Sequence, residues 1–209
     1  MKKSIFRENK RYTFSDYFEM NYSPSDIVKE FGYSFAFEVI DLPKYLAYDP
    51  TPIQKLQTNL YKILPKITLN SEIAKREFLI APLLMEIACV VNLKINVEYL
   101  LDVDDKLNGS LDYFLMANQN LVIIEAKKKD IESGFNQLAV ELIALDKFED
   151  NQDITTLYGA VTLGDIWRFG ILDRPQQRII KNIHIHAIPE DIVEVFSILM
   201  GIFTNSTKL

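Results

Sequence analysis

Two acidic residues and one lysine near the middle of the chain have a spacing that could support chemistry on a phosphate. Twelve residues separate Asp112 from Glu125, and Lys127 follows Glu125 by two positions. Strand side chains alternate between two faces, so Glu125 and Lys127 are expected on one face and Ala126 on the other. Carboxylates and a backbone carbonyl are ligands that suit Mg²⁺ or Mn²⁺, and a nearby lysine can stabilise developing negative charge.

A β-hairpin is expected to bring these residues together. Apolar residues occur at alternate positions around Asp112, and residues 121–124 form a short apolar run before Glu125. Residues 117–120, Ala-Asn-Gln-Asn, separate the two segments, and asparagine tolerates turn geometry. This hairpin would place Asp112, at the start of one strand, beside Glu125, at the end of the next.

Two flanking helices offer further candidates. Ser71 is a good N-cap for a helix predicted to reach about Val91, in which Glu77 shares the apolar stripe and should face the sheet. Pro82 predicts a kink or break in this helix. A second helix, residues 131–148, carries Gln137, with Glu141 one turn later. Glu77 could equally form a structural ion pair, and Gln137 could be an ordinary surface amide.

These residues and their context resemble the PD-(D/E)XK nuclease superfamily. The match rests on Asp112, on the Glu125-Ala-Lys127 triplet after Val122-Ile-Ile124, and on the helix with Gln137. Residues 159–169 resemble the strand–turn–strand that follows the core in relatives, which include nuclease modules of type I restriction motor subunits and uncharacterised bacterial, often cyanobacterial, proteins. Leu111 stands where the motif has its leading proline.

The resemblance implies an Mg²⁺- or Mn²⁺-dependent endonuclease that hydrolyses phosphodiester bonds, with DNA favoured over RNA by resemblance only. Asp112, Glu125, the Ala126 carbonyl and Glu77 would hold the metal. Asp112, Glu125, Lys127, Glu77 and Gln137 would form the catalytic set. Two alternatives stay open: a nuclease-fold module without catalysis that binds nucleic acid or a protein partner, and an ordinary cross-strand charge network.

The order of predicted elements indicates an α/β fold. The element order predicts helices packed on a central mixed sheet. The resemblance implies that residues 67–209 form a restriction-endonuclease-like domain with an αβββαβ core. Residues 1–66 are expected to form an N-terminal α/β extension. It would comprise a mobile basic tail over residues 1–11, a helix at 27–31, a strand at 33–40 and a helix from Thr51 to about Leu64.

Composition narrows the class of protein. The chain has 209 residues, 48% of them hydrophobic, and no apolar run near the roughly 20 residues of a membrane helix. Its single cysteine, Cys89, excludes a disulfide framework, so a cytoplasmic location is expected. The net charge of −6 argues against a general nucleic-acid coat but not against a nuclease.

His184 and His186 lack a third ligand nearby and are interpreted as structural. A homodimer or a partner protein is left open.

Overall fold

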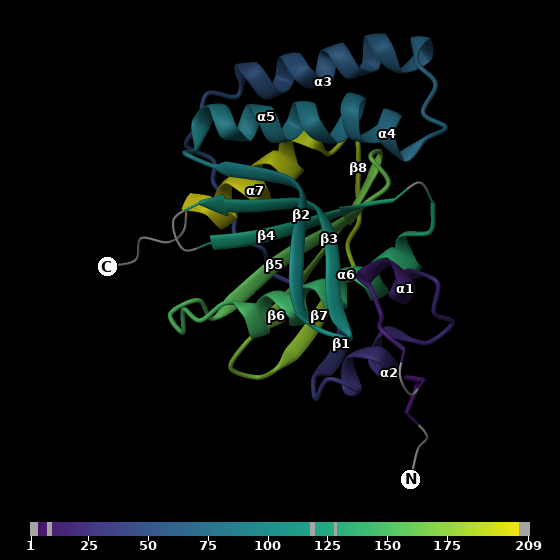
Figure 1. Cartoon of the computed structure of the whole chain (residues 1–209). Coiled ribbons are helices and arrows are strands. Elements are labelled where there is room, and N and C mark those ends of the chain that lie inside the picture. The colour runs from purple at the N-terminus through teal and green to yellow at the C-terminus, as the bar shows by residue number, and fades with distance from the viewer. Residues whose placement is uncertain (1–3, 8–9, 118–119, 128, 205–209) are drawn as a thin grey trace.

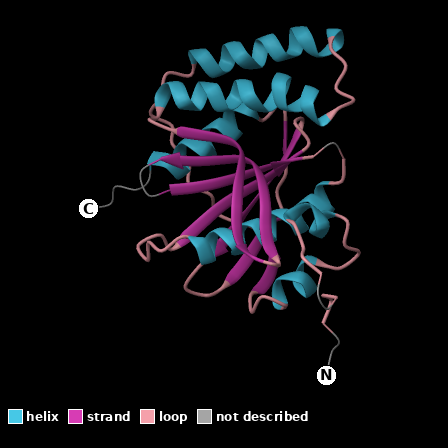
Figure 2. Cartoon of the chain, in the orientation of Figure 1, coloured by secondary structure: helices cyan, strands magenta, loops and turns pink. Residues whose placement is uncertain are grey.

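The computed structural model describes residues 4–7, 10–117, 120–127 and 129–204, and it has three layers. A mixed eight-stranded sheet lies in the middle, with its main path in the order β1-β7-β6-β5-β4-β3-β2 (Figure 1). Helices cover both of its faces (Figure 2). The predicted mixed α/β architecture is therefore confirmed.

The sheet combines parallel and antiparallel strand pairs. β4 pairs with β5, and β1 with β7, in parallel, whereas the other pairs are antiparallel. Their bounds are β1 Ser34–Glu38, β2 Lys94–Asp104, β3 Leu107–Ala117, β4 Asn120–Ala126, β5 Thr156–Thr162, β6 Ile166–Asp173, β7 Arg178–Asn182 and β8 His186–Ala187. The predicted hairpin is the β3–β4 pair, although residues 118 and 119 of its turn lie outside the described residues.

The helices pack in two groups on opposite faces of the sheet. On one face lie α3 (Thr51–Ile63), α4 (Glu72–Lys75), α5 (Ala81–Val90) and α7 (Ile192–Thr204); on the other lie α1 (Phe14–Phe18), α2 (Pro24–Lys29) and α6 (Ile131–Phe148). Each group buries its own apolar cluster against the sheet. Trp167 and Phe169 lie in the first cluster and are core residues.

The N-terminal segment is built into the same sheet. β1 pairs in parallel with β7, and α3 packs near α5 and α7, so these N-terminal elements contribute to the layers formed by the rest of the chain. The tail predicted to be mobile, residues 1–11, contacts the rest of the fold where it is described, and its mobility stays a prediction. Phe6 packs against the rings of Tyr12 and Phe31, and the exposed Arg11 pairs with Asp102 on β2.

The helix predicted from Ser71 to Val91 begins as expected and is then interrupted. The Ser71 hydroxyl accepts a hydrogen bond from the Ala74 N–H, which confirms the N-cap. After one α-helical turn, residues 76–80 form a π-helical turn, and α5 begins at Ala81 with Pro82 in its first turn. A π-turn holds an additional residue, so it offsets the faces of the helix before and after it.

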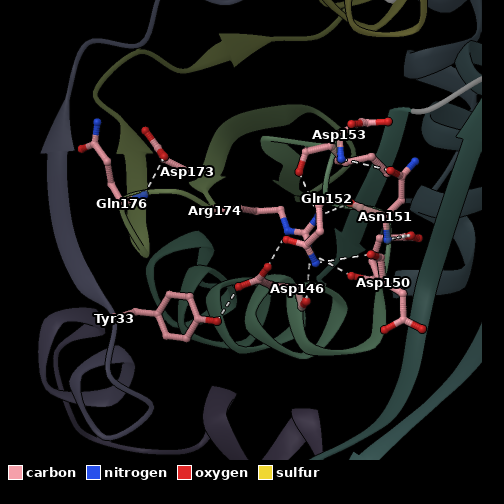
Figure 3. A network of polar contacts seen from close by, with 11 residues as sticks. Tyr33, Asp146, Asp150, Asn151, Gln152, Asp153, Asp173, Arg174 and Gln176 are labelled. Atoms are coloured by element: carbon pink, nitrogen blue, oxygen red, sulfur yellow. Dashed lines mark hydrogen bonds and ion pairs between the residues drawn. The ribbon is translucent and has the colours of Figure 1, made fainter.

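The C-terminal end of α6 is held by Arg174, which follows β6 (Figure 3). Its Nε atom lies 2.5 Å from Asp146 Oδ1, and its other nitrogens donate to backbone carbonyls, including those of Glu149 and Ile154 at 2.8 Å. The Tyr33 hydroxyl donates to the second oxygen of Asp146 at 2.5 Å. At the other end, Asp130 caps the first backbone N–H groups of α6. Both ends of α6 are therefore fixed by side chains.

Within the described residues, no helix combines the length and the apolar character needed to cross a membrane. His186 is buried beside Glu194, whereas His184 is exposed.

Candidate functional site

The β3–β4 hairpin brings the first two predicted carboxylates to the same region of the sheet. Tyr113 pairs with Ile124, which places Asp112 and Glu125 next to each other across the two strands. Asp112 Oδ2 accepts a hydrogen bond of 2.8 Å from the Ala126 N–H, so the end of β4 fixes this carboxylate. Asp112 lies within β3 rather than at its start, because the strand begins at Leu107.

Glu125 sits beneath Lys127 and α6. Its side chain is 1% exposed and is ion-paired with Lys127, whose side chain is 15% exposed. Gln137 Nε2 donates to Glu125 Oε1 at 2.7 Å. The alternation predicted for the Glu-Ala-Lys triplet is confirmed, since Ala126 packs into the apolar cluster on the opposite face. Gln137 is buried rather than a surface amide.

Glu141 is a member of this cluster that the sequence reading did not include. Gln137 Nε2 also donates to Glu141 Oε1 at 2.8 Å, so one amide bridges two carboxylates. Burial is the main cause that raises the pKa of Glu141 to about 7. The position of Glu141, one helical turn after Gln137, could have indicated that both side chains face the same site. A fully buried glutamate is rare without a partner, so burial was not the expected state of Glu141.

The charges of the cluster depend strongly on one another. Burial, and then the nearby charges of Glu141 and Asp112, raise the pKa of Glu125 well above its ordinary value. Burial alone would lower the pKa of Lys127, but the charge of Glu125 and its hydrogen bond outweigh burial, so this pKa is raised. Lys127 is therefore a cation at neutral pH and cannot accept a proton there.

Glu77 does not join the cluster, so its predicted orientation toward the sheet is wrong. The π-turn over residues 76–80 changes which side chains point inward, and Glu77 is exposed. Arg76 faces the strands instead. Its NH1 atom lies 3.6 Å from Asp112 Oδ1 and 3.5 Å from Glu98 Oε1. The Asp112 carboxylate thus has a guanidinium as its neighbour where the sequence predicted a carboxylate.

A close approach between α6 and the sheet is required at Gly134. A Cβ atom at this position would lie 2.6 Å from Val161 Cγ2 and 3.2 Å from Lys127 Cγ. The absent side chain allows α6 to approach β5 while the Lys127 stem passes alongside. Gly134 therefore helps to set the distance between Gln137 and Glu125.

A hollow of about 430 Å³ opens over the cluster between α1 and the start of α4. Among the described residues, its lining includes Lys127 and Gln137 but neither Asp112 nor Glu125. Lys127 Nζ lies 5.3 Å from the centre of the Phe18 ring, which borders the hollow from α1. A ligand that enters here would meet Lys127 and Gln137 before the buried carboxylates.

The donor set can be tested against a divalent cation. In the parts of the chain that are described, no three His, Cys, Asp or Glu side chains are grouped so as to hold a metal. However, Glu125 Oε2 and Glu141 Oε2 are buried without hydrogen-bond partners among these residues. Mg²⁺ commonly takes one or two protein carboxylates and keeps several waters. Asp112 and Glu125 are two carboxylates of this kind, whereas Glu77 is exposed and does not join them.

Comparison with known proteins gave no match: no family model, no curated protein and no solved structure is significantly similar to this chain.

Proposed function

We propose that this protein is a divalent-metal-dependent nuclease with a restriction-endonuclease-like core. One observation carries the proposal: a hairpin and a helix bring Asp112, Glu125, Lys127 and Gln137 into one cluster. The element order around it, helix, three strands, helix and strand, has the αβββαβ form expected of that core. DNA is the proposed substrate.

Each side chain has a role that follows from its surroundings. Lys127 borders the hollow as a cation, so it would bind a phosphate oxygen and stabilise the charge that develops during hydrolysis. Gln137 fixes the Glu125 carboxylate through its amide nitrogen. Asp112, held by the Ala126 N–H, is the second fixed carboxylate.

Asp112, Glu125 and the Ala126 carbonyl would hold Mg²⁺ or Mn²⁺. When bound, such an ion lowers the pKa of a coordinated water and polarises a phosphate. One oxygen of Glu125 is buried without a hydrogen-bond partner among the described residues, and burial is the first cause of its raised pKa, so a cation at this oxygen would stabilise the charged carboxylate. Arg76 compensates part of the negative charge from the side of Asp112.

Incubation with plasmid and linear DNA in Mg²⁺ or Mn²⁺ tests the proposal. We expect wild-type protein to cut DNA and the Lys127→Ala variant to lose at least a hundredfold in rate, as for removal of one stabilising donor. Lys62→Ala, an exposed lysine on α3, is the matched control and should cut like wild type. Intact DNA and RNA with wild type, or equal cutting by Lys127→Ala, would refute catalysis.

A module that binds without cutting is the second candidate, and Arg76 favours it. A guanidinium beside Asp112 can take the place of a metal ion as the source of positive charge. Calorimetric titration with Mn²⁺ separates the two functions. Binding that disappears in Asp112→Asn supports the nuclease, and a lack of any metal binding supports the module.

A further inference from the structure

A second group of basic side chains lies on the same face of the sheet as the candidate site. Arg168 on β6 and Lys181 on β7 both bind Glu132, which stands in the first turn of α6. The two basic side chains are 11% and 5% exposed, whereas that of Glu132 is 62% exposed. Arg168 is therefore largely buried although it carries a charge.

The carboxylate of Glu132 lies between the two basic side chains, and each of its oxygens contacts a different cation. Oε1 contacts Arg168 and Oε2 contacts Lys181. A phosphate presents the same kind of oxygens, and arginine and lysine are its usual protein ligands. Two cations face one carboxylate, and Arg168 Nε is buried with no hydrogen-bond partner among the described residues. The group retains positive charge and an unused donor.

A hollow of about 290 Å³ adjoins these residues and is bordered by aromatic rings. Phe37 and Tyr22 line it and are 53% and 47% exposed. Lys181 Nζ lies 5.0 Å from the centre of the Phe37 ring. Asn136, only 4% exposed, also lines the hollow, and its Oδ1 has no partner within the described parts of the chain.

Exposed rings beside cations are typical of proteins that bind single strands. The rings stack on bases while the cations bind the backbone. In a duplex the base faces are already stacked on one another, so they are not available to Phe37 and Tyr22. The chemistry of the hollow therefore favours an unpaired nucleotide over a duplex.

The group is placed to act together with the candidate site. In the sheet, Glu125 pairs with Val161, and Val161 pairs with Arg168. Two strand spacings separate Glu125 from Arg168, a distance of roughly 10 Å between backbones. The segment from Phe18 to Tyr22 borders both hollows in turn. One chain of nucleotides can reach both places.

We propose that this surface binds a single-stranded segment of nucleic acid. A phosphate replaces Glu132 between Arg168 and Lys181, and the neighbouring base stacks on Phe37. This inference deepens the proposed nuclease function, on which it rests for its biological meaning, by naming the strand state of the substrate. Glu132 acts as an internal competitor that weakens the binding of anions.

Fluorescence anisotropy with a labelled oligothymidine tests the proposal on the full chain. EDTA is present, so that binding is measured without cleavage. We expect Phe37→Ala to weaken binding about tenfold, the loss of one stacked base. Glu132→Gln should tighten binding several-fold and steepen the logarithmic salt dependence by about 0.7 for each additional phosphate contact. Phe37 and Glu132 are both exposed, so neither change removes core packing.

Two variants on α3, across the sheet, serve as matched controls. Tyr61→Ala removes a ring that is 50% exposed, and Lys62→Gln removes an exposed charge; neither should change affinity. The proposal is overturned if Phe37→Ala behaves like Tyr61→Ala or if Glu132→Gln leaves affinity unchanged. Tighter binding of a duplex, or equal displacement by polyglutamate, overturns it as well.

Binding and cleavage fail independently in these experiments. A protein that binds oligothymidine through Phe37 but cuts nothing refutes the nuclease and leaves the binding surface. A protein that cuts DNA in a Lys127-dependent manner, with affinity insensitive to Phe37, refutes the binding surface alone.

Discussion

Arg76 is the residue that most changes the chemistry of the candidate site. Its guanidinium lies 3.6 Å from Asp112, and both side chains are largely buried, at 14% and 18% exposed. A fixed positive charge at this distance opposes the arrival of another cation. The strength of any metal site is thus set partly by a residue outside the predicted ligand set.

Replacing Arg76 with glutamine is expected to tighten Mn²⁺ binding about fivefold, since loss of one partly buried ion pair changes the free energy by about 1 kcal/mol. Isothermal titration calorimetry measures this directly. Lys62→Gln on α3 controls for the change in net charge alone. Unchanged or weaker Mn²⁺ binding in Arg76→Gln would show that the guanidinium does not compete with the ion.

Glu141 links the stability of the metal-free protein to pH. Its pKa is about 7 in the folded state, above the ordinary value of 4.5. Between these values the folded state holds a proton that the unfolded state has released, so this group lowers the free energy of unfolding as pH rises. Above pH 7 the folded protein carries the full cost of a buried charge.

Glu141→Gln should therefore stabilise the metal-free protein by about 3 kcal/mol at pH 8, with the gain fading toward pH 5. The glutamine oxygen can still accept the Gln137 hydrogen bond. Urea unfolding of both proteins at several pH values provides the measurement. A gain that is independent of pH, or a loss at pH 8, would contradict the assigned charge of Glu141.

Among the elements, α6 and the β3–β4 hairpin could be predicted from the sequence, and the helix before β2 could not. The bounds of α6 and the cap at Ser71 follow from local pattern and capping chemistry, which one segment contains by itself. The π-turn could not be predicted in this way. The spacing of apolar residues is compatible with a continuous α-helix, and only packing against the sheet determines where the additional residue of the π-turn lies. For this reason the sequence predicted that Glu77 faces the sheet, and it did not predict that Arg76 does.

Gly134→Ala tests how closely α6 must approach β5. Alanine normally stabilises a helix by up to about 1 kcal/mol relative to glycine. Here its Cβ would lie 2.6 Å from Val161 Cγ2, so we expect a net loss of about 1 to 3 kcal/mol and slower cleavage. Chemical denaturation gives the stability, and the Val161→Ala background should reduce the loss. An alanine that stabilises the wild-type background would contradict the close contact.

At the scale of the whole molecule, the elements described before residue 67 belong to the fold that carries the site. Strand order depends on contacts distant in sequence, so the pairing of β1 with β7 could not be read from local pattern. Likewise, α1 was not predicted, although Phe14 and Tyr17 are 1% and 0% exposed in the core. The basic residues before α1 made this part of the sequence resemble a solvated tail, so the aromatic residues that follow them were not assigned to the core.

Residues 67–209 expressed alone are expected not to fold. The truncation removes β1, α3 and the buried aromatic residues of α1, and each such aromatic is worth about 3 to 5 kcal/mol against a total stability of 5–15 kcal/mol. Circular dichroism during thermal unfolding distinguishes the outcomes, with the full chain as reference. A cooperative transition in the truncated protein would show that residues 67–209 are an independent domain.

The fixation of α6 at both ends has a consequence for how a ligand reaches the carboxylates. Asp130 and Arg174 hold its two termini, so the helix that carries Gln137 and Glu141 cannot withdraw as a unit. The hollow is also bordered by α1, which has only five residues and no basic side chain in its last turn. Access to Glu125 therefore depends on how often α1 moves. The rate at which a ligand exchanges at the site should follow the local stability of α1 rather than that of the sheet.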